Sequence, residues 1–151
     1  IFMIIPSVGI VAFKDQQVLL VRHGKAAGHV EGTYGLPAGR FEEGESAIQA
    51  AKREFEEETG LGIYEEDLHE ISGNVFEATM KRSDGTEKTF SWKVFFASKF
   101  EGSISGNDET TPEWVDVYEL SKLELLPNVE KAIKNCLEYK KEMELRDIDN
   151  R

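Results

Sequence analysis

Four glutamates fall within five positions of the stretch REFEEETG, residues 53–60. On a helix, positions i, i+3 and i+4 share one face, so Glu54, Glu57 and Glu58 project together. Like charges at this spacing destabilise an exposed helix by about 0.2–0.5 kcal/mol per pair. A solvated acidic face is the simplest interpretation of these residues taken alone. Carboxylates are also the ligands that Mg²⁺ selects, commonly together with substrate phosphates, so this face is a candidate metal site.

The residues around this stretch resemble a complete Nudix box, GRFEEGESAIQAAKREFEEETGL, residues 39–61. In that pattern a Gly is followed after five residues by Glu and, after seven more, by Arg-Glu-U-x-Glu-Glu-x-Gly-U, where U is apolar. The chain fills the nine specified positions with Gly39, Glu45, Arg53, Glu54, Phe55, Glu57, Glu58, Gly60 and Leu61. The flanking segments are also similar to the family, so the resemblance extends over nearly the whole chain.

The resemblance implies a hydrolase that depends on Mg²⁺ or Mn²⁺. Its substrate would be a nucleoside diphosphate linked to another group, such as a nucleoside triphosphate, ADP-ribose or a sugar nucleotide, and it would cleave a phosphoanhydride bond. The implied metal ligands are the carbonyl of Gly39 and the carboxylates of Glu54, Glu57 and Glu58. Glu45 and Arg53 are implied to support catalysis, since the Arg orients the glutamates. A bound metal ion polarises phosphoryl oxygens and lowers the pKa of its bound water.

A further carboxylate from a distant loop usually completes such sites in the family, as a ligand or a base. The stretch GNDETTPEW, residues 106–114, offers Asp108, Glu109 and Glu113. We favour Glu109. The alternative is that all three carboxylates only solvate the loop.

Four residues are candidates for substrate binding. Arg22 ends an apolar run and could bind a phosphate through both guanidinium nitrogens, or could be a surface Arg at a strand end. Tyr34 and Arg40 flank the loop YGLPAGR, in which Tyr34 stands where the family commonly has Trp. Asn128 falls where some triphosphate-cleaving members place a base-contacting Asn, although beside Pro127 it also fits a helix start.

The identity of the substrate stays open at this stage. Ala38, between Pro37 and Gly39, resembles the pattern of ADP-ribose and sugar-nucleotide pyrophosphatases, but the Pro that those enzymes carry downstream of the box is not present near Glu77. Trp92 and Trp114 could stack on a base, although aromatic residues in strands more often belong to the core.

Two other function classes compete with this interpretation. Arg22-His23-Gly24 after an apolar strand resembles the opening signature of histidine phosphatases, which need a longer chain and a second catalytic His, whereas only His29 and His69 remain. A nucleotide-binding Nudix sensor without catalysis is the other alternative, but such domains typically lose box glutamates and none is missing here. Three scattered His and one Cys offer no zinc-ligand spacing.

The composition limits the remaining possibilities. A chain of 151 residues fits one domain, residues 1–151, and a formal net charge of −11 disfavours nucleic acids and anionic membranes as partners. No apolar run approaches the roughly 20 residues of a membrane span. We therefore expect a cytoplasmic monomer or homodimer with a small-molecule nucleotide substrate and a buried, unreactive Cys136. The first Met is at position 3, so whether residues 1 and 2 are native stays open.

The secondary structure that must position these residues follows from local patterns. Apolar β-branched runs predict strands at 8–13 and 18–21, followed by a Gly-rich loop at 25–40. Ser46 and Gln49 form a capping-box pattern, which predicts a helix at 46–59 ending before Gly60. A hairpin is expected at 74–100 with its turn at Asp84 and Gly85, then a strand at 113–120 and an amphipathic helix at 128–145. The resemblance implies an α+β Nudix fold, an α/β/α sandwich with a mixed sheet.

Overall fold

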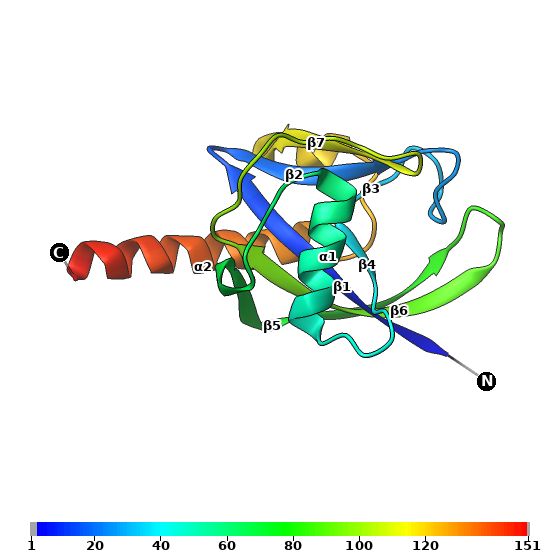
Figure 1. Ribbon diagram of the computed structural model, residues 1–151. Helices are drawn as coiled ribbons and strands as arrows, with labels where there is room; N and C mark the ends of the chain where they lie inside the picture. The colour runs from blue at the N-terminus through cyan, green and yellow to red at the C-terminus, as the bar shows by residue number, and fades with distance from the viewer. Residues whose placement is uncertain (1–2, 151) are drawn as a thin grey trace.

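A computed structural model describes residues 3–150; the question of whether residues 1 and 2 are native lies outside this range. In chain order the elements are β1 (Ile4–Lys14), β2 (Gln17–His23), β3 (Tyr34–Gly35), β4 (Ala38–Arg40), α1 (Ala47–Thr59), a 3₁₀ helix (Glu65–Asp67), β5 (Leu68–Lys81), β6 (Glu87–Ala97), β7 (Thr110–Asp116), a second 3₁₀ helix (Val117–Lys122) and α2 (Val129–Asp149) (Figure 1). Helices and a sheet are both present, as an α+β fold requires.

The strands form one sheet with the order β3-β2-β1-β6-β5, in which β4 also pairs with β1 and β7 with β2. The pairing of β1 with β6 is parallel, whereas the other strand pairs are antiparallel. The predicted mixed sheet is therefore confirmed. The predicted hairpin of the first two strands is also confirmed, with Phe13 opposite Val18.

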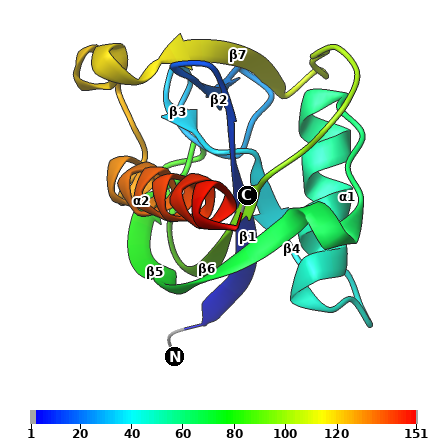
Figure 2. The same ribbon diagram turned by 90° about the vertical axis from the view of Figure 1, so that its left-hand side faces the viewer.

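The central strand β1 is buried on both faces. Because side chains alternate along a strand, Val8 and Ile10 pack in the core beneath α1, whereas Val11 packs in the core that includes Ile133 of α2. Figure 2 shows α1 and α2 on opposite sides of β1. The helices thus cover the two faces of the sheet, which is the expected sandwich.

Helix α1 begins and ends where the sequence predicts. The Ser46 hydroxyl accepts from the Gln49 N–H, the Gln49 side chain accepts from the Ser46 N–H, and Gly60 ends the helix with φ 78°. Phe55 is fully buried. Burial of this apolar face fixes the rotation of the helix, so its glutamates face the other way.

The predicted loop at 25–40 is wrong in part, because it contains the short strands β3 and β4. Their partners are distant in sequence: Gly39 lies opposite Val8, and Tyr34 lies opposite Arg22. The Pro and Gly residues indicate a loop locally, but free strand edges on β1 and β2 order this segment. This pairing places Gly39 beside α1.

The strand predicted at 113–120 is also partly wrong, because β7 spans Thr110–Asp116 and residues 117–120 belong to a 3₁₀ helix. The Asp116 carboxylate accepts a hydrogen bond from the Tyr118 N–H, which turns the chain away from the sheet. At the other end, Thr110 pairs with His23, so the strand begins three residues earlier than expected.

The remaining elements agree with expectation. The β5–β6 hairpin turns at Asp84 and Gly85, although β5 begins earlier, at Leu68, with an irregular register between Glu70 and Val75. Helix α2 is present and Cys136 is fully buried, as predicted. Among residues 3–150 no helix combines the length and the apolar character that a bilayer crossing needs.

Candidate active site

Arg53 holds the carboxylates of the box together. Its Nε and Nη2 donate to the two oxygens of Glu45 at 2.7 and 2.8 Å, and Nη1 donates to Glu54 at 2.8 Å and to Glu57 at 3.3 Å. Nη2 also donates to the carbonyl of Arg40 at 2.9 Å, which ties the helix to β4. These bonds lower the pKa of Glu45 to about 2. Arg53 thus contacts three of the box glutamates, and its role in orienting them for catalysis stays a prediction.

Glu58 faces away from this network, toward β4 and β7. Its Oε1 accepts from the Ala38 N–H at 2.8 Å and its Oε2 accepts from the Thr110 hydroxyl at 3.1 Å. Burial raises the pKa of Glu58 to about 8 in spite of these donors, and the charges of Glu54 and Glu109 contribute in the same direction. Glu58 is therefore a carboxyl group that needs a cation or a proton to neutralise it.

Gly39 lies directly against Glu54. A Cβ at position 39 would overlap the Glu54 carboxylate, so only Gly allows this close approach. Burial raises the pKa of Glu54, although Arg53 acts in the opposite direction. The backbone of β4 at Gly39 thus lies in close contact with the Glu54 carboxylate of α1, and both residues line the cavity.

The predicted metal ligands lie near one another, but their side chains do not converge on one point. Among residues 3–150, no three His, Cys, Asp or Glu side chains converge enough to hold a metal ion. Arg53 accounts for this, because it engages Glu54 and Glu57 while Glu58 is held by Ala38 and Thr110. The chemistry of the donors nevertheless fits a hard divalent cation, since all are oxygens and two are carboxyls with raised pKa values.

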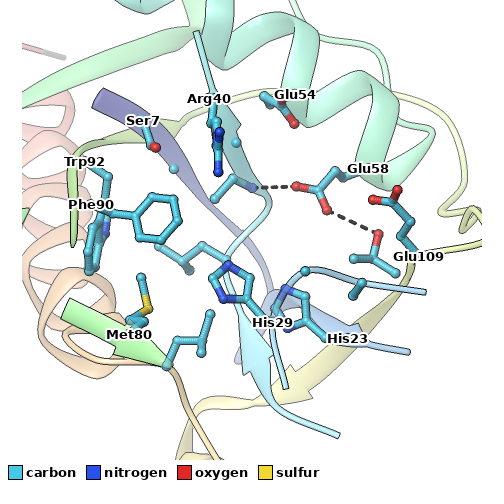
Figure 3. A pocket seen from close by; sticks show the side chains of 18 of the residues that line it. Ser7, His23, His29, Arg40, Glu54, Glu58, Met80, Phe90, Trp92 and Glu109 are labelled. Atoms are coloured by element: carbon cyan, nitrogen blue, oxygen red, sulfur yellow. Dashed lines mark hydrogen bonds between the residues drawn. The ribbon is translucent and has the colours of Figure 1, made fainter. Parts of the chain in front are cut away.

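A cavity of about 340 Å³ opens beside these glutamates. Figure 3 shows Glu54, Glu58 and Glu109 at one end, Met80, Phe90 and Trp92 at the other, and Arg40 between them. Ligand cavities in proteins range over about 300–1,000 Å³, so this one is large enough for a small ligand. Its two ends differ in chemistry: one is acidic and the other aromatic.

The three candidates for the distant carboxylate, Asp108, Glu109 and Glu113, differ in position relative to the cavity. Glu109 lines the cavity near Glu58, and the backbone N–H groups of Glu109 and Thr110 both donate to Asn107 Oδ1. Asp108 does not line the cavity. Glu113 lies on β7 beside Arg22, with Nε and Oε2 3.5 Å apart.

The predicted substrate residues do not all meet at the cavity. Arg40 lines it, but Arg22 and Tyr34 lie together beside Glu113 on the neighbouring strands. Asn128 is the N-cap residue of α2, with φ 66° and no side-chain capping bond, and it lines a separate shallow pocket. The helix-start interpretation of Asn128 therefore matches its position.

Several residues lining the cavity were missed by the sequence interpretation. His23, which was considered only as a phosphatase nucleophile, is 6% exposed and its Nδ1 lies 2.9 Å from the Thr33 carbonyl oxygen. His29 packs edge-on against it, and burial lowers the pKa of His29 to about 4. Arg82 and Phe90 come from the β5–β6 hairpin. Only the alternation along that hairpin hinted that Met80, Arg82 and Phe90 share a face.

The two tryptophans have different surroundings. Trp92 lines the cavity at 8% exposure and packs against Phe76. Trp114 stacks on Phe100 in the core beneath α1, with ring centroids 5.8 Å apart. Both therefore belong to the core, as expected of strand aromatics, and Trp92 also lines the cavity.

Known proteins resemble this chain in sequence and in structure. A 93-residue match to an oxidized purine nucleoside triphosphate hydrolase from Danio rerio is 32% identical and covers 62% of this chain and 55% of that protein, so the chain spans about half the length of that relative. A MutT NUDIX hydrolase from Burkholderia pseudomallei superimposes with a TM-score of 0.72 at 22% identity, over 88% of this chain and 98% of the other. The NUDIX domain of Shewanella oneidensis NrtR, solved with ADP ribose, gives 0.71 at 19% identity, over 92% and 90%.

The family profile described as NUDIX domain matches residues 3–137, which include the whole box and every element from β1 into α2. Because this match includes Arg22-His23-Gly24, it argues against the histidine-phosphatase alternative. The chain belongs to the Nudix family.

Proposed function

We propose that this protein is a divalent-metal-dependent pyrophosphohydrolase acting on a nucleoside diphosphate linked to another group. The observation that carries the proposal is that residues of a complete Nudix box line a cavity. Arg53 restrains Glu45, Glu54 and Glu57, while the half-buried Glu58 and the exposed Glu109 line the cavity where a phosphate would lie. A sensor domain would not need this set of carboxylates.

Gly39, Glu54, Glu57 and Glu58 would hold Mg²⁺ or Mn²⁺. When bound, the ion would polarise phosphoryl oxygens and favour attack by water at neutral pH. In the reaction, an oxygen–phosphorus bond forms to water and the bond from phosphorus to the bridging oxygen breaks, so each product ends in a phosphate. A proton leaves the attacking water, and Glu109 is the carboxylate that we propose accepts it.

The rest of the chain positions the reacting groups. Arg53 fixes the direction of Glu54, and the Thr110 hydroxyl and Ala38 N–H fix Glu58. The aromatic end of the cavity, with Trp92, offers a face for a nucleobase. A nucleotide lying along the cavity would therefore place its anhydride at the acidic end and its base at the aromatic end.

The substrate class is supported only as far as a nucleotide. The Danio rerio relative is an oxidized purine nucleoside triphosphate hydrolase, and the Shewanella oneidensis structure contains ADP ribose. Both ligands are nucleotides with a phosphoanhydride. We therefore propose a nucleotide substrate without choosing between triphosphates and ADP-ribose-like compounds.

A substrate panel tests the proposal. The purified protein is assayed with canonical and oxidised nucleoside triphosphates, ADP-ribose, sugar nucleotides and dinucleoside polyphosphates, each with Mg²⁺ and with Mn²⁺, and the products are identified by phosphorus NMR. We expect turnover of at least one member, release of phosphate-terminated products and loss of activity in EDTA. Glu43→Gln serves as the charge-matched control, because Glu43 is an exposed box-region glutamate that does not line the cavity.

Two outcomes would contradict the proposal. Tight nucleotide binding without turnover of any member, in the presence of bound metal, would indicate the sensor alternative. Equal loss of activity in Glu43→Gln and Glu57→Gln would mean that the box glutamates act only through overall charge.

A further inference from the structure

Two arginines reach the same aromatic ring inside the cavity. The guanidinium carbon of Arg82 lies 5.3 Å from the centroid of Phe90, and that of Arg40 lies 5.8 Å from it. Both arginines line the cavity, one from the β5–β6 turn and the other from the end of β4. We call Arg40 and Arg82 the arginine pair.

The position of Arg82 is set by several contacts from a different loop. The Ser83 N–H donates to the Gly28 carbonyl at 2.8 Å, and the Ser83 hydroxyl donates to the Ala27 carbonyl at 2.9 Å. Nη1 of Arg82 lies 3.2 Å from the ring nitrogens of His29. A Cβ on Gly28 would overlap the Arg82 guanidinium. The loop and the hairpin together hold this guanidinium at the cavity wall.

The arginine pair has no acidic partner in the described part of the chain. Between residues 3 and 150, no carboxylate oxygen lies within 4.0 Å of either guanidinium, although the chain has 29 acidic residues. Burial and the charge of Arg40 lower the pKa of Arg82, whereas the charge of Asp84 acts in the opposite direction, so the two cations repel each other and Asp84 offsets only part of the shift. His29 adds no further charge at neutral pH, because its pKa is about 4.

An anion between the two guanidinium groups would relieve this repulsion. Arginine matches phosphate geometry because it can donate two parallel hydrogen bonds. The phosphoanhydride itself belongs at the acidic end of the cavity, among Glu54, Glu58 and Glu109, whereas Phe90, which both arginines approach, lies at the aromatic end (Figure 3). The arginine pair would therefore contact a different anionic group of the same ligand.

We propose that Arg40 and Arg82 bind a phosphate monoester of the substrate that is not part of the scissile phosphoanhydride. This phosphate is carried either by the nucleoside or by the group linked to its diphosphate. The inference rests on the proposed nucleotide pyrophosphohydrolase activity, and it narrows the substrate class to nucleotides with an additional phosphate.

Matched ligands that differ by one phosphate test the inference in two arms. For a phosphate on the nucleoside, calorimetry in Mg²⁺ compares AMP with adenosine 2′,5′-bisphosphate and adenosine 3′,5′-bisphosphate, none of which contains a phosphoanhydride. For a phosphate on the linked group, kcat/KM is compared between ADP-ribose and ADP-ribose 1″-phosphate. We expect a preference of at least about tenfold for the additional phosphate in one arm.

Three variants connect this preference to the arginine pair. Arg82→Met removes the guanidinium and keeps most of the apolar length, whereas Gly28→Ala displaces the guanidinium and keeps its charge. Lys81→Met is the control, because Lys81 precedes Arg82 on the hairpin, carries the same charge and does not line the cavity. We expect the preference to fall below about threefold in the first two variants and to persist in the control.

The outcomes separate the inference from the function on which it rests. Turnover of nucleotides without preference in either arm would overturn the inference and leave the proposed function. A preference that survives in both Arg82→Met and Gly28→Ala would also overturn it. If a melting curve shows that Arg82→Met is unfolded, Gly28→Ala and Arg40→Met replace it. Absence of binding and turnover for every nucleotide would overturn the proposed function together with the inference.

Discussion

Replacing Arg53 by Met is the most informative single change in the box. The substitution keeps most of the apolar length of the side chain but removes every donor. Glu45 and Glu54 then lose their direct cation, and the carbonyl of Arg40 loses its hydrogen bond. Because three carboxylates would face one another without neutralisation, we expect a less stable protein and a displaced Glu54.

The size of the effect follows from the exposure of the partners. The side chain of Arg53 is 19% exposed and that of Glu54 is 13% exposed, whereas Glu57 is 58% exposed. Breaking a fully buried ion pair costs about 3–5 kcal/mol, and breaking an exposed one costs about 0–1 kcal/mol. After discounting for solvent screening, we expect a loss of about 2–4 kcal/mol for Arg53→Met. In a domain of this length, that corresponds to a decrease in Tm of between about 4 and 16 °C.

Thermal unfolding in EDTA is the assay, since metal cannot then replace the lost guanidinium. Arg22→Met is the stability control: Arg22 is 47% exposed and has a single contact with Glu113 at 3.5 Å, so its loss should cost less than about 1 kcal/mol. In a double variant with Glu45→Gln, the loss should be smaller than the sum of the two single losses. A Tm within about 2 °C of the wild type for Arg53→Met would refute the reasoning.

The other predictions concern rate and pH. Glu57→Gln should lower kcat by at least about 10²-fold, with an unchanged or higher Tm in EDTA, because a like charge leaves the acidic face; unfolding with retained specific activity would contradict this. Gly39→Ala should lower kcat by about tenfold or more and lower Tm by less than Arg53→Met does, since the new Cβ displaces the Glu54 carboxylate, which is only one of the partners of Arg53; full activity would contradict it. The pKa of His29 is lowered from 6.5 to about 4, so at this residue the unfolded state binds more protons between these values, and His29 adds an upward slope to the free energy of unfolding against pH across that window, whereas the raised pKa of Glu58 adds a downward slope. His29→Asn should remove the upward contribution in denaturant titrations, and an unaltered slope would show that His29 is not responsible.

Local sequence signals were sufficient for the helix that carries the glutamates. Ser46, Gln49 and Gly60 determine its ends through neighbouring backbone groups, and the apolar spacing of Phe55 determines its rotation. The acidic face follows from positions within this one helix, whereas the role of Arg53 was implied by the resemblance to the Nudix box. No long-range contact is needed to predict the helix or its acidic face.

The other half of the cavity could not be predicted in this way. Arg82 and Phe90 reach it because the β5–β6 hairpin lies beside a loop some fifty residues earlier, where Ser83 bonds to Gly28. Pairing over such distances depends on which strand edges are free, and no local pattern encodes that. The same reason explains β3 and β4, whose short sequences resemble a loop until β1 and β2 supply partners.

The glutamates of α1 are accommodated in two different ways on the two sides of the helix. Arg53 neutralises the glutamates on one side of α1, and that network needs no metal. Glu58 lies on the other side, where Ala38 and Thr110 donate two hydrogen bonds that do not offset its burial, so its pKa is raised to about 8. Taking a carboxylate out of water without full compensation costs free energy, and such groups occur most often at functional sites. Glu58 is thus a carboxyl group whose two donors do not offset its burial, and it lies at the cavity, where the proposed cation would bind between the protein and a phosphate.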